Sequence, residues 1–148
     1  MSVSNAENEW FDFTSQFVTK LNDNNNDWKK LDDEEQELAS LWKLEMDIHN
    51  GGFLQFFTNW GVECYDNAVR CLKKMGAVKC LAIIESSYEI IEKYKDDKRL
   101  TTYQDLYDLI SKKEMKLIDK LDQQYWDLPE DIIALTFKTY DKSKFNNV

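Results

Sequence analysis

The sequence predicts an all-α protein, and three of its properties support this prediction. Only one proline and four glycines occur in 148 residues, and strands need such turn residues more often than long helices do. Apolar residues recur every three or four positions along much of the chain, as on one face of a helix. Hydrophobic residues make up 43% of the chain and include 8 Phe, 7 Tyr and 5 Trp, enough for the core of one domain over residues 1–148. We therefore expect a single compact bundle of about six to eight helices.

The N-terminal helix is predicted from about residue 6 to residue 21. Its apolar face consists of side chains three and four positions apart, namely Trp10, Phe13, Phe17 and Leu21. A stretch of mostly Asn and Asp follows it and ends it. A second helix begins at Asp32 or Asp33, because an Asp side chain accepts hydrogen bonds from the free N–H groups of a first turn. It extends to about residue 50, where Gly51 and Gly52 favour a helix end.

The middle of the chain is predicted to form three helical segments. Residues 53–60 are rich in aromatic side chains and form a short buried helical turn, which Gly61 breaks. A further helix over residues 62–75 ends at Gly76, and another follows over about residues 77–94.

The last third begins with a charged loop at residues 95–99. One or two helices follow between residues 102 and 126. Pro129 is predicted to open the final helix, because proline lacks an N–H group that a first turn leaves unpaired anyway.

The charge of the chain disfavours several classes of partner. The net charge is −9, and residues 1–50 carry 12 acidic and only 4 basic side chains. Such a chain repels phosphate backbones and anionic lipids, so we expect no direct binding to nucleic acid or to a membrane. The N-terminus lacks the features of a signal peptide, and the longest apolar run, residues 80–84, is too short to span a bilayer. These observations predict a cytoplasmic protein.

The three cysteines, Cys64, Cys71 and Cys80, are odd in number and lack the spacing of a zinc site or of a disulfide framework. We expect them to be reduced and buried, as small hydrophobic residues. Neither a metal nor another cofactor is predicted.

Glu45 stands out because it falls on the apolar side of the second predicted helix. A carboxylate there must find hydrogen-bond partners. In one interpretation it accepts hydrogen bonds from the backbone N–H groups around Gly51 and Gly52 and joins two helices. In the other, Glu45 and His49, which lie four residues apart, form an acid–base pair or half of a metal site. The structural interpretation is favoured, since His49 is the only histidine of the chain.

An acidic cluster surrounds the start of the second predicted helix. It comprises Asp27, Asp32, Asp33, Glu34, Glu35 and Glu37. Such a cluster is most often a solvated face. The alternative is a partner-binding surface whose carboxylates a basic protein recognises in place of a nucleic-acid backbone.

Residues 45–61, with the sequence Glu-Met-Asp-Ile-His-Asn-Gly-Gly-Phe-Leu-Gln-Phe-Phe-Thr-Asn-Trp-Gly, resemble the signature of a bacterial family. Most of its members are filed under unknown function, and the family is named after a DNA-mimic protein. The resemblance continues through residues 68–77 and 121–140 and covers about residues 30–145. It implies an acidic, dimeric, all-α protein whose namesake occupies the DNA-binding surface of a regulator.

The resemblance also implies roles for particular residues. The residues that match motif positions are Glu45, Asn50, Gly51, Gly52, Phe53 and Gly76. Their roles in the family are architectural, and no catalytic residue is implied. The mimicry is not encoded in this motif, so membership alone does not transfer it.

Three hypotheses about function follow from the sequence. The first is a protein that presents its acidic N-terminal third to a basic DNA-binding protein, such as a transcriptional regulator, or to a nuclease toxin that it neutralises. The second is an enzyme centred on Glu45 and His49. The third is a homo-oligomeric structural domain whose acidity serves only solubility.

Overall fold

The computed structural model describes residues 4–145, and all regular secondary structure in this part of the chain is helical, with no strand. The α-helices are α1 (Asn5–Asp23), α2 (Asp33–Gly51), α3 (Phe53–Met75), α4 (Val78–Glu92), α5 (Leu106–Leu109), α6 (Lys112–Trp126) and α7 (Ile132–Thr139). Short 3-10 helices are η1 (Trp28–Lys30), η2 (Tyr103–Asp105) and η3 (Lys142–Phe145). The predicted all-α fold class is confirmed.

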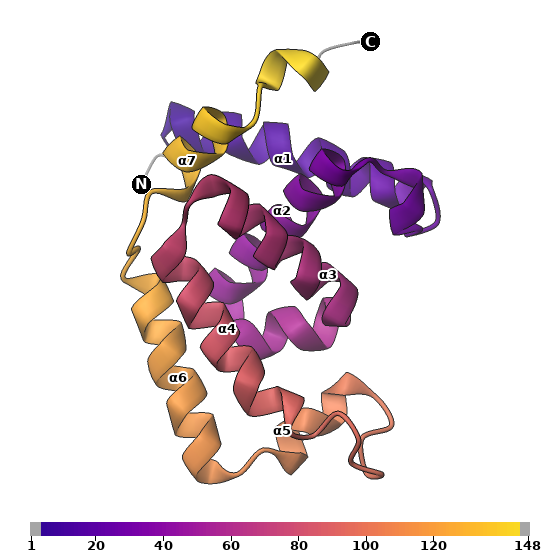
Figure 1. Cartoon of the computed structure of the whole chain (residues 1–148), viewed down its shortest axis with the longest axis vertical. Coiled ribbons are helices and arrows are strands. Elements are labelled where there is room, and N and C mark those ends of the chain that lie inside the picture. Colours follow the sequence, from indigo (N-terminus) through magenta and orange to yellow (C-terminus); the bar gives the residue numbers. More distant parts are fainter. Residues whose placement is uncertain (1–3, 146–148) are drawn as a thin grey trace.

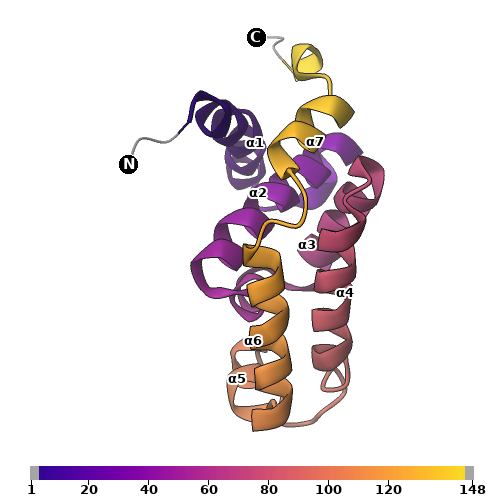
Figure 2. The ribbon, with the colours of Figure 1, turned by 90° about the vertical axis from the view of Figure 1, so that its left-hand side faces the viewer.

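The helices form a bundle around α2 and α3, which share the most extensive contact of any two elements. The helices α1 and α7 cover one end of this pair, while α4 and α6 run side by side away from it (Figures 1 and 2). The short helix α5 follows α4 and precedes α6 in the sequence, and it lies at the end of the molecule remote from α1 and α7 (Figure 1). None of the helices in residues 4–145 has a stretch apolar and long enough to cross a membrane.

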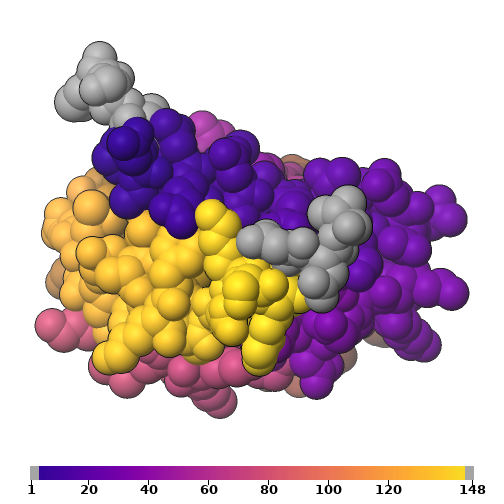
Figure 3. Space-filling view, turned by 90° about the horizontal axis from the view of Figure 1, so that it is seen from above, coloured from indigo at the N-terminus to yellow at the C-terminus, as the bar shows by residue number. Residues whose placement is uncertain are grey.

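The core between α1 and the rest of the bundle matches the predicted apolar face. Trp10, Phe13, Phe17 and Leu21 are all buried. The space-filling view in Figure 3 shows α1 and the C-terminal segment side by side. Aromatic rings join them, because Phe13 and Phe17 both pack edge-on or tilted against Phe145. Burying each such ring contributes about 1.5–3 kcal/mol, so the two ends of the chain stabilise each other.

Two predicted breaks in the middle of the chain are confirmed. Gly61 has a φ of 80° and interrupts α3 with a kink, a conformation that glycine adopts far more easily than other residues. Gly76 follows α3 and separates it from α4. Because only Gly76 and Ala77 join α3 to α4, the two helices run antiparallel and pack against each other.

The start of the last helix was predicted wrongly. Pro129 lies in the connector between α6 and α7, and α7 begins at Ile132. The Asp131 side chain accepts a hydrogen bond from the Ala134 N–H and caps the helix. An Asp cap satisfies a backbone donor that a first-turn proline only removes, and it therefore sets the boundary.

Candidate functional site

The start of α2 is held by a capping box. Asp32 accepts a hydrogen bond from the Glu35 N–H at 2.9 Å, and Glu35 in return accepts one from the Asp32 N–H at 3.0 Å. The second oxygen of Glu35 lies 2.6 Å from the ammonium group of Lys20, on α1. Glu35 is thus a buried link between two helices and not part of an open surface.

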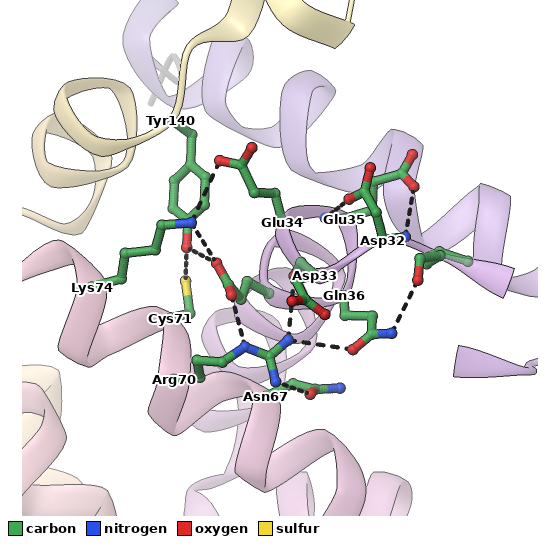
Figure 4. A network of polar contacts seen from close by, with 12 residues as sticks. Asp32, Asp33, Glu34, Glu35, Gln36, Asn67, Arg70, Cys71, Lys74 and Tyr140 are labelled. Atoms are coloured by element: carbon green, nitrogen blue, oxygen red, sulfur yellow. Dashed lines mark hydrogen bonds and ion pairs between the residues drawn. The ribbon is translucent and has the colours of Figure 1, made fainter. Parts of the chain in front are cut away.

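Glu37 lies at the centre of a second polar network and is only 3% exposed. Its carboxylate accepts hydrogen bonds from Arg70 Nε at 2.7 Å, from Lys74 Nζ at 3.2 Å and from the Tyr140 hydroxyl at 2.7 Å. Figure 4 shows Arg70 and Lys74, on α3, together with Tyr140, at the end of α7, converging on the start of α2. Burial raises the pKa of Tyr140 far above its ordinary value, so the phenol stays a donor. The network joins three helices.

Arg70 extends this network along α2. Its Nη2 atom lies 3.3 Å from both the Asp33 carbonyl oxygen and the Gln36 side-chain oxygen. Its Nη1 donates to the Asn67 side-chain oxygen at 3.1 Å (Figure 4). One guanidinium group therefore satisfies acceptors on two helices, a role that suits its planar arrangement of donors.

These contacts correct the prediction that the whole acidic cluster faces solvent. Glu35 and Glu37 are buried, whereas Asp32 and Asp33 are exposed and Asp27 and Glu34 are half-buried. Lys20, Arg70 and Lys74 stand among them. The surface at the start of α2 is therefore mixed in charge.

The sequence contained a signal for the burial of Glu37. Glu37 precedes Leu41, Leu44 and Ile48 by four, seven and eleven positions, and these spacings place all four on one helical face. All three apolar residues are fully buried. A carboxylate on such a face requires buried partners, as Glu37 indeed has.

A second acidic surface, which the sequence did not predict, lies on α3 and α4. We call it the α3–α4 acidic face, and it consists of the exposed residues Glu63, Asp66, Glu85, Glu89 and Glu92. Of these, only Glu92 forms an ion pair among the described residues, with Lys95 at 3.7 Å. The antiparallel arrangement of α3 and α4 brings together carboxylates that are far apart in sequence.

The negative charge of this face raises the pKa of two tyrosines that lie between these helices. Tyr65 and Tyr88 stack with their ring centroids 4.4 Å apart. Burial, followed by the charge of Glu85, raises the pKa of Tyr65, and burial, followed by the charge of Glu92, raises that of Tyr88. Carboxylates are thus the main charged groups that raise the pKa of both hydroxyls.

Glu45 is buried as predicted, with 9% exposure, but its predicted partners are wrong. One carboxylate oxygen accepts a hydrogen bond from the Tyr125 hydroxyl, on α6, at 2.5 Å. The other lies 3.7 Å from Nε2 of His49, and this nearby carboxylate raises the pKa of the imidazole. Glu45 lies six residues before the end of α2 at Gly51, about 9 Å along the helix axis, so its carboxylate does not reach the N–H groups at Gly52.

Asp122 performs the role that the sequence assigned to Glu45. Its carboxylate accepts a hydrogen bond from the Phe53 N–H at 2.9 Å and so caps the start of α3 from α6. Phe53 itself is fully buried, and Asn50 contacts Gln55 beyond the turn at 3.4 Å. Five of the six motif residues, Glu45 and Asn50 to Phe53, thus lie at the junction of α2, α3 and α6, whereas Gly76 lies between α3 and α4.

Burial raises the pKa of Asp122 to about 6, against the opposing effect of its hydrogen bond from Phe53. In the unfolded chain its pKa is about 3.9. Below pH 4 both states hold the proton, so the contribution of Asp122 to stability is complete. As the pH rises towards 6, the unfolded chain loses the proton first and stability falls by roughly 1–3 kcal/mol.

We therefore predict that Asp122→Asn, which keeps an acceptor for the Phe53 N–H, removes this pH dependence. The free energy of unfolding should be measured by urea titration at pH 4, 5, 6 and 7 for both proteins. The variant should gain stability relative to the wild type as the pH rises, because the other carboxylates contribute equally to both curves. A difference that is constant over this range would contradict a raised pKa at Asp122.

The three cysteines are buried, as predicted. Burial raises the pKa of the thiols of Cys64, Cys71 and Cys80 to about 12, so they are neutral at physiological pH. A neutral thiol is a weak nucleophile and a weak metal ligand. Within residues 4–145, no three Cys, His, Asp or Glu side chains are grouped around a common point as metal ligands.

The comparison with protein families agrees with the resemblance drawn from residues 45–61. A family model described as DMP19-like protein matches residues 29–143, which is more than half of the chain. No curated protein and no solved structure gives a significant match. The chain therefore belongs to the DMP19-like protein family.

Proposed function

We propose that this protein is a DNA mimic that binds the DNA-binding surface of a basic protein, such as a transcriptional regulator. Membership of the DMP19-like family supports this class of function. The observation that carries the proposal is the α3–α4 acidic face, where four of the five exposed carboxylates form no ion pair with another described residue and only Glu92 has a basic partner, Lys95. Such a surface attracts the lysines and arginines that otherwise contact phosphates.

The spacing of the carboxylates on α4 supports the same function. Glu85, Glu89 and Glu92 follow one another by four and three residues, which places them on one face. At 1.5 Å of rise per residue, they are about 6 Å and about 4.5 Å apart along the helix axis. Phosphates of one DNA strand repeat at a comparable interval, about 3.4 Å along the duplex axis and about 7 Å through space.

The same surface chemistry fits a basic nuclease toxin, so inhibition of such a toxin remains the alternative. Both partners act in the cytoplasm, and we place this protein there too. An enzyme centred on Glu45 and His49 has less support, because one oxygen of Glu45 is bound to Tyr125 and the nearby Cys80 thiol is neutral. The resemblance further implies a homodimer, which light scattering in solution tests directly.

The test is capture of a DNA-binding protein from the native host by the tagged chain, followed by competition. We expect duplex DNA and moderate salt to release the captured protein, because the attraction is electrostatic and screened. The captured protein, once purified, should lose its DNA in a mobility-shift assay when this chain is added. Capture that resists both DNA and salt would contradict mimicry, and capture of a nuclease whose activity is inhibited would favour the alternative.

Charge reversal locates the surface. We predict that Glu63→Lys, Asp66→Lys, Glu85→Lys and Glu89→Lys together weaken binding roughly tenfold or more. The matched control reverses the same number of exposed acids on α1, namely Glu7, Glu9, Asp12 and Asp23. A third variant, Asp33→Lys with Glu34→Lys, tests the surface at the start of α2 that the sequence predicted.

The affinities of the three variants should be measured by titration calorimetry against the purified partner, once circular dichroism has shown that each is helical. We expect only the first set to reduce binding strongly. Equal loss in the first and second sets would indicate a diffuse effect of net charge. If only the third variant lost binding, the partner would contact the surface at the start of α2.

A further inference from the structure

A groove of about 1010 Å³ is lined by none of the residues of the α3–α4 acidic face. Its walls come from the first turns of α1, the C-terminal half of α2 and the connector between α6 and α7, which Figure 2 shows running from orange to yellow. Trp10, Phe11, Met46 and Ile133 make these walls largely apolar. The volume is at the upper end of the range for small-molecule sites.

The rim of the groove carries a strained, exposed leucine. Leu128 directly follows α6 and the Asp127 cap, has a φ of 52° and is 66% exposed. Glycine is the usual residue at such a position, because a side chain is strained there. Phe11, which also lines the groove, is exposed too. Leu128 and Phe11 are therefore large apolar side chains that are exposed to solvent and line the groove.

A buried carboxylate, that of Glu45, also lines the groove. Glu45 uses one oxygen to accept the Tyr125 hydroxyl. Its other oxygen lies 3.7 Å from Nε2 of His49, whose pKa it raises, and no described residue donates a hydrogen bond to it within 3.5 Å. A buried carboxylate is stabilised by a further hydrogen-bond donor, and a ligand in the groove can supply it.

The charges around the groove determine which ligand fits. Among the residues that the structure describes, four carboxylates line it, from Glu7, Glu45, Glu130 and Asp131, against one imidazole and no lysine or arginine. Glu130 and Asp131 are already engaged as caps, because they accept backbone N–H groups at the starts of α4 and α7. Glu45 is thus the buried carboxylate of the lining that caps no helix, and it favours a cation.

We propose that this groove binds a small organic cation with an apolar body, whose ammonium group is held by Glu45. The apolar body lies against Trp10 and Phe11 and under Leu128. A small molecule fits better than a partner helix, because one buried carboxylate recognises a single charged group within mostly apolar walls. This site shares no residue with the α3–α4 acidic face and does not depend on the proposed DNA mimicry.

Two fluorescent probes with the same apolar group and opposite charge test this proposal. The cationic probe is dansylcadaverine, and the anionic probe is dansyl-6-aminohexanoate. Titration of each into the full-length chain, followed by dansyl fluorescence, gives the two dissociation constants. We expect the cation to bind at least about tenfold more tightly than the anion.

Three variants locate the binding. Glu45→Gln keeps an acceptor for Tyr125 and should weaken the cation about tenfold while leaving the anion unchanged. Glu9→Gln, an exposed acid on α1 outside the groove, should change neither constant. Phe11→Ser should weaken both probes, and unchanged circular dichroism of each variant shows that the fold is intact.

Equal affinity for the two probes, no saturable binding of either, or an unchanged cation affinity in Glu45→Gln would each overturn the proposal. So would binding that disappears as the protein concentration rises and light scattering shows a dimer, because a second copy of the chain would then fill the groove.

Discussion

Glu37→Ala is expected to destabilise the fold by about 3–5 kcal/mol, because it removes one partner from a buried ionic network. Arg70, Lys74 and the Tyr140 hydroxyl all donate to this carboxylate, and the variant leaves each donor without it. The loss acts on three helices at once, since the donors lie on α3 and at the end of α7. Urea denaturation with detection by tryptophan fluorescence measures the change in the free energy of unfolding.

Glu34→Ala is the matched control for this prediction. Glu34 lies one turn before Glu37 on the same helix and is partly exposed, and its ion-pair partners among the described residues are Lys74 at 3.5 Å and Lys144 at 4.0 Å. Exposed ion pairs of this kind contribute about 0–1 kcal/mol, so the control should change stability little. Similar losses in the two variants would show that the network does not contribute more than a surface ion pair.

A second comparison separates the charge of Glu37 from its packing. Replacing a whole buried ion pair by apolar side chains is often neutral, whereas removing one partner is costly. Glu37→Leu combined with Arg70→Met should therefore lose less stability than Glu37→Leu alone. This comparison tests whether the cost comes from the donors that are left unpaired.

The sequence predicted the helices of this fold because their signals are local. The apolar face of α1, the break at Gly61 and the end of α3 at Gly76 each depend on residues within a few turns of one another. The start of α7 was predicted wrongly, since Pro129 and Asp131 are both helix-start signals and only their three-dimensional context decides between them.

The polar contacts were less predictable because they join distant parts of the chain. Glu45 was recognised as buried from its helical face, yet its partner Tyr125 lies 80 residues away. Asp122 caps α3 across 69 residues, and no local pattern marks it. A carboxylate on an apolar face shows that a partner must exist, whereas the packing of α6 beside α2 determines which residue it is.

The α3–α4 acidic face was less predictable than the helices but more predictable than the polar contacts between distant residues. The spacing of Glu85, Glu89 and Glu92 shows that they share one face of a helix. The short connection at Gly76 further indicates that α3 and α4 are antiparallel neighbours. Counting charge along the sequence instead drew attention to the first third of the chain, where Glu35 and Glu37 are used inside the fold. Net charge in a segment does not show how much of that charge remains on the surface.

Gly52→Ala is expected to cost roughly 2–6 kcal/mol, from backbone strain of about 1–3 kcal/mol and the loss of a buried hydrogen bond of a similar size. Gly52 has a φ of 98° and a ψ of 178°, a combination that is almost restricted to glycine. A Cβ atom at Gly52 would lie 2.1 Å from a carboxylate oxygen of Asp122. The side chain of Asp122 must therefore move, and it then loses the N–H of Phe53.

The control for this prediction is Gly76→Ala. Gly76 has a φ of 72° and a ψ of 23°, and no atom lies within 4 Å of the Cβ that the substitution adds. Only the left-handed conformation then opposes the change, at about 1–2 kcal/mol. Gly52→Ala combined with Asp122→Ala removes the steric conflict and keeps the strain, so the double variant should lose less stability than the sum of the two single variants. Additive losses, measured by urea denaturation at pH 7, would show that the approach of Asp122 to Gly52 contributes nothing beyond the two separate changes.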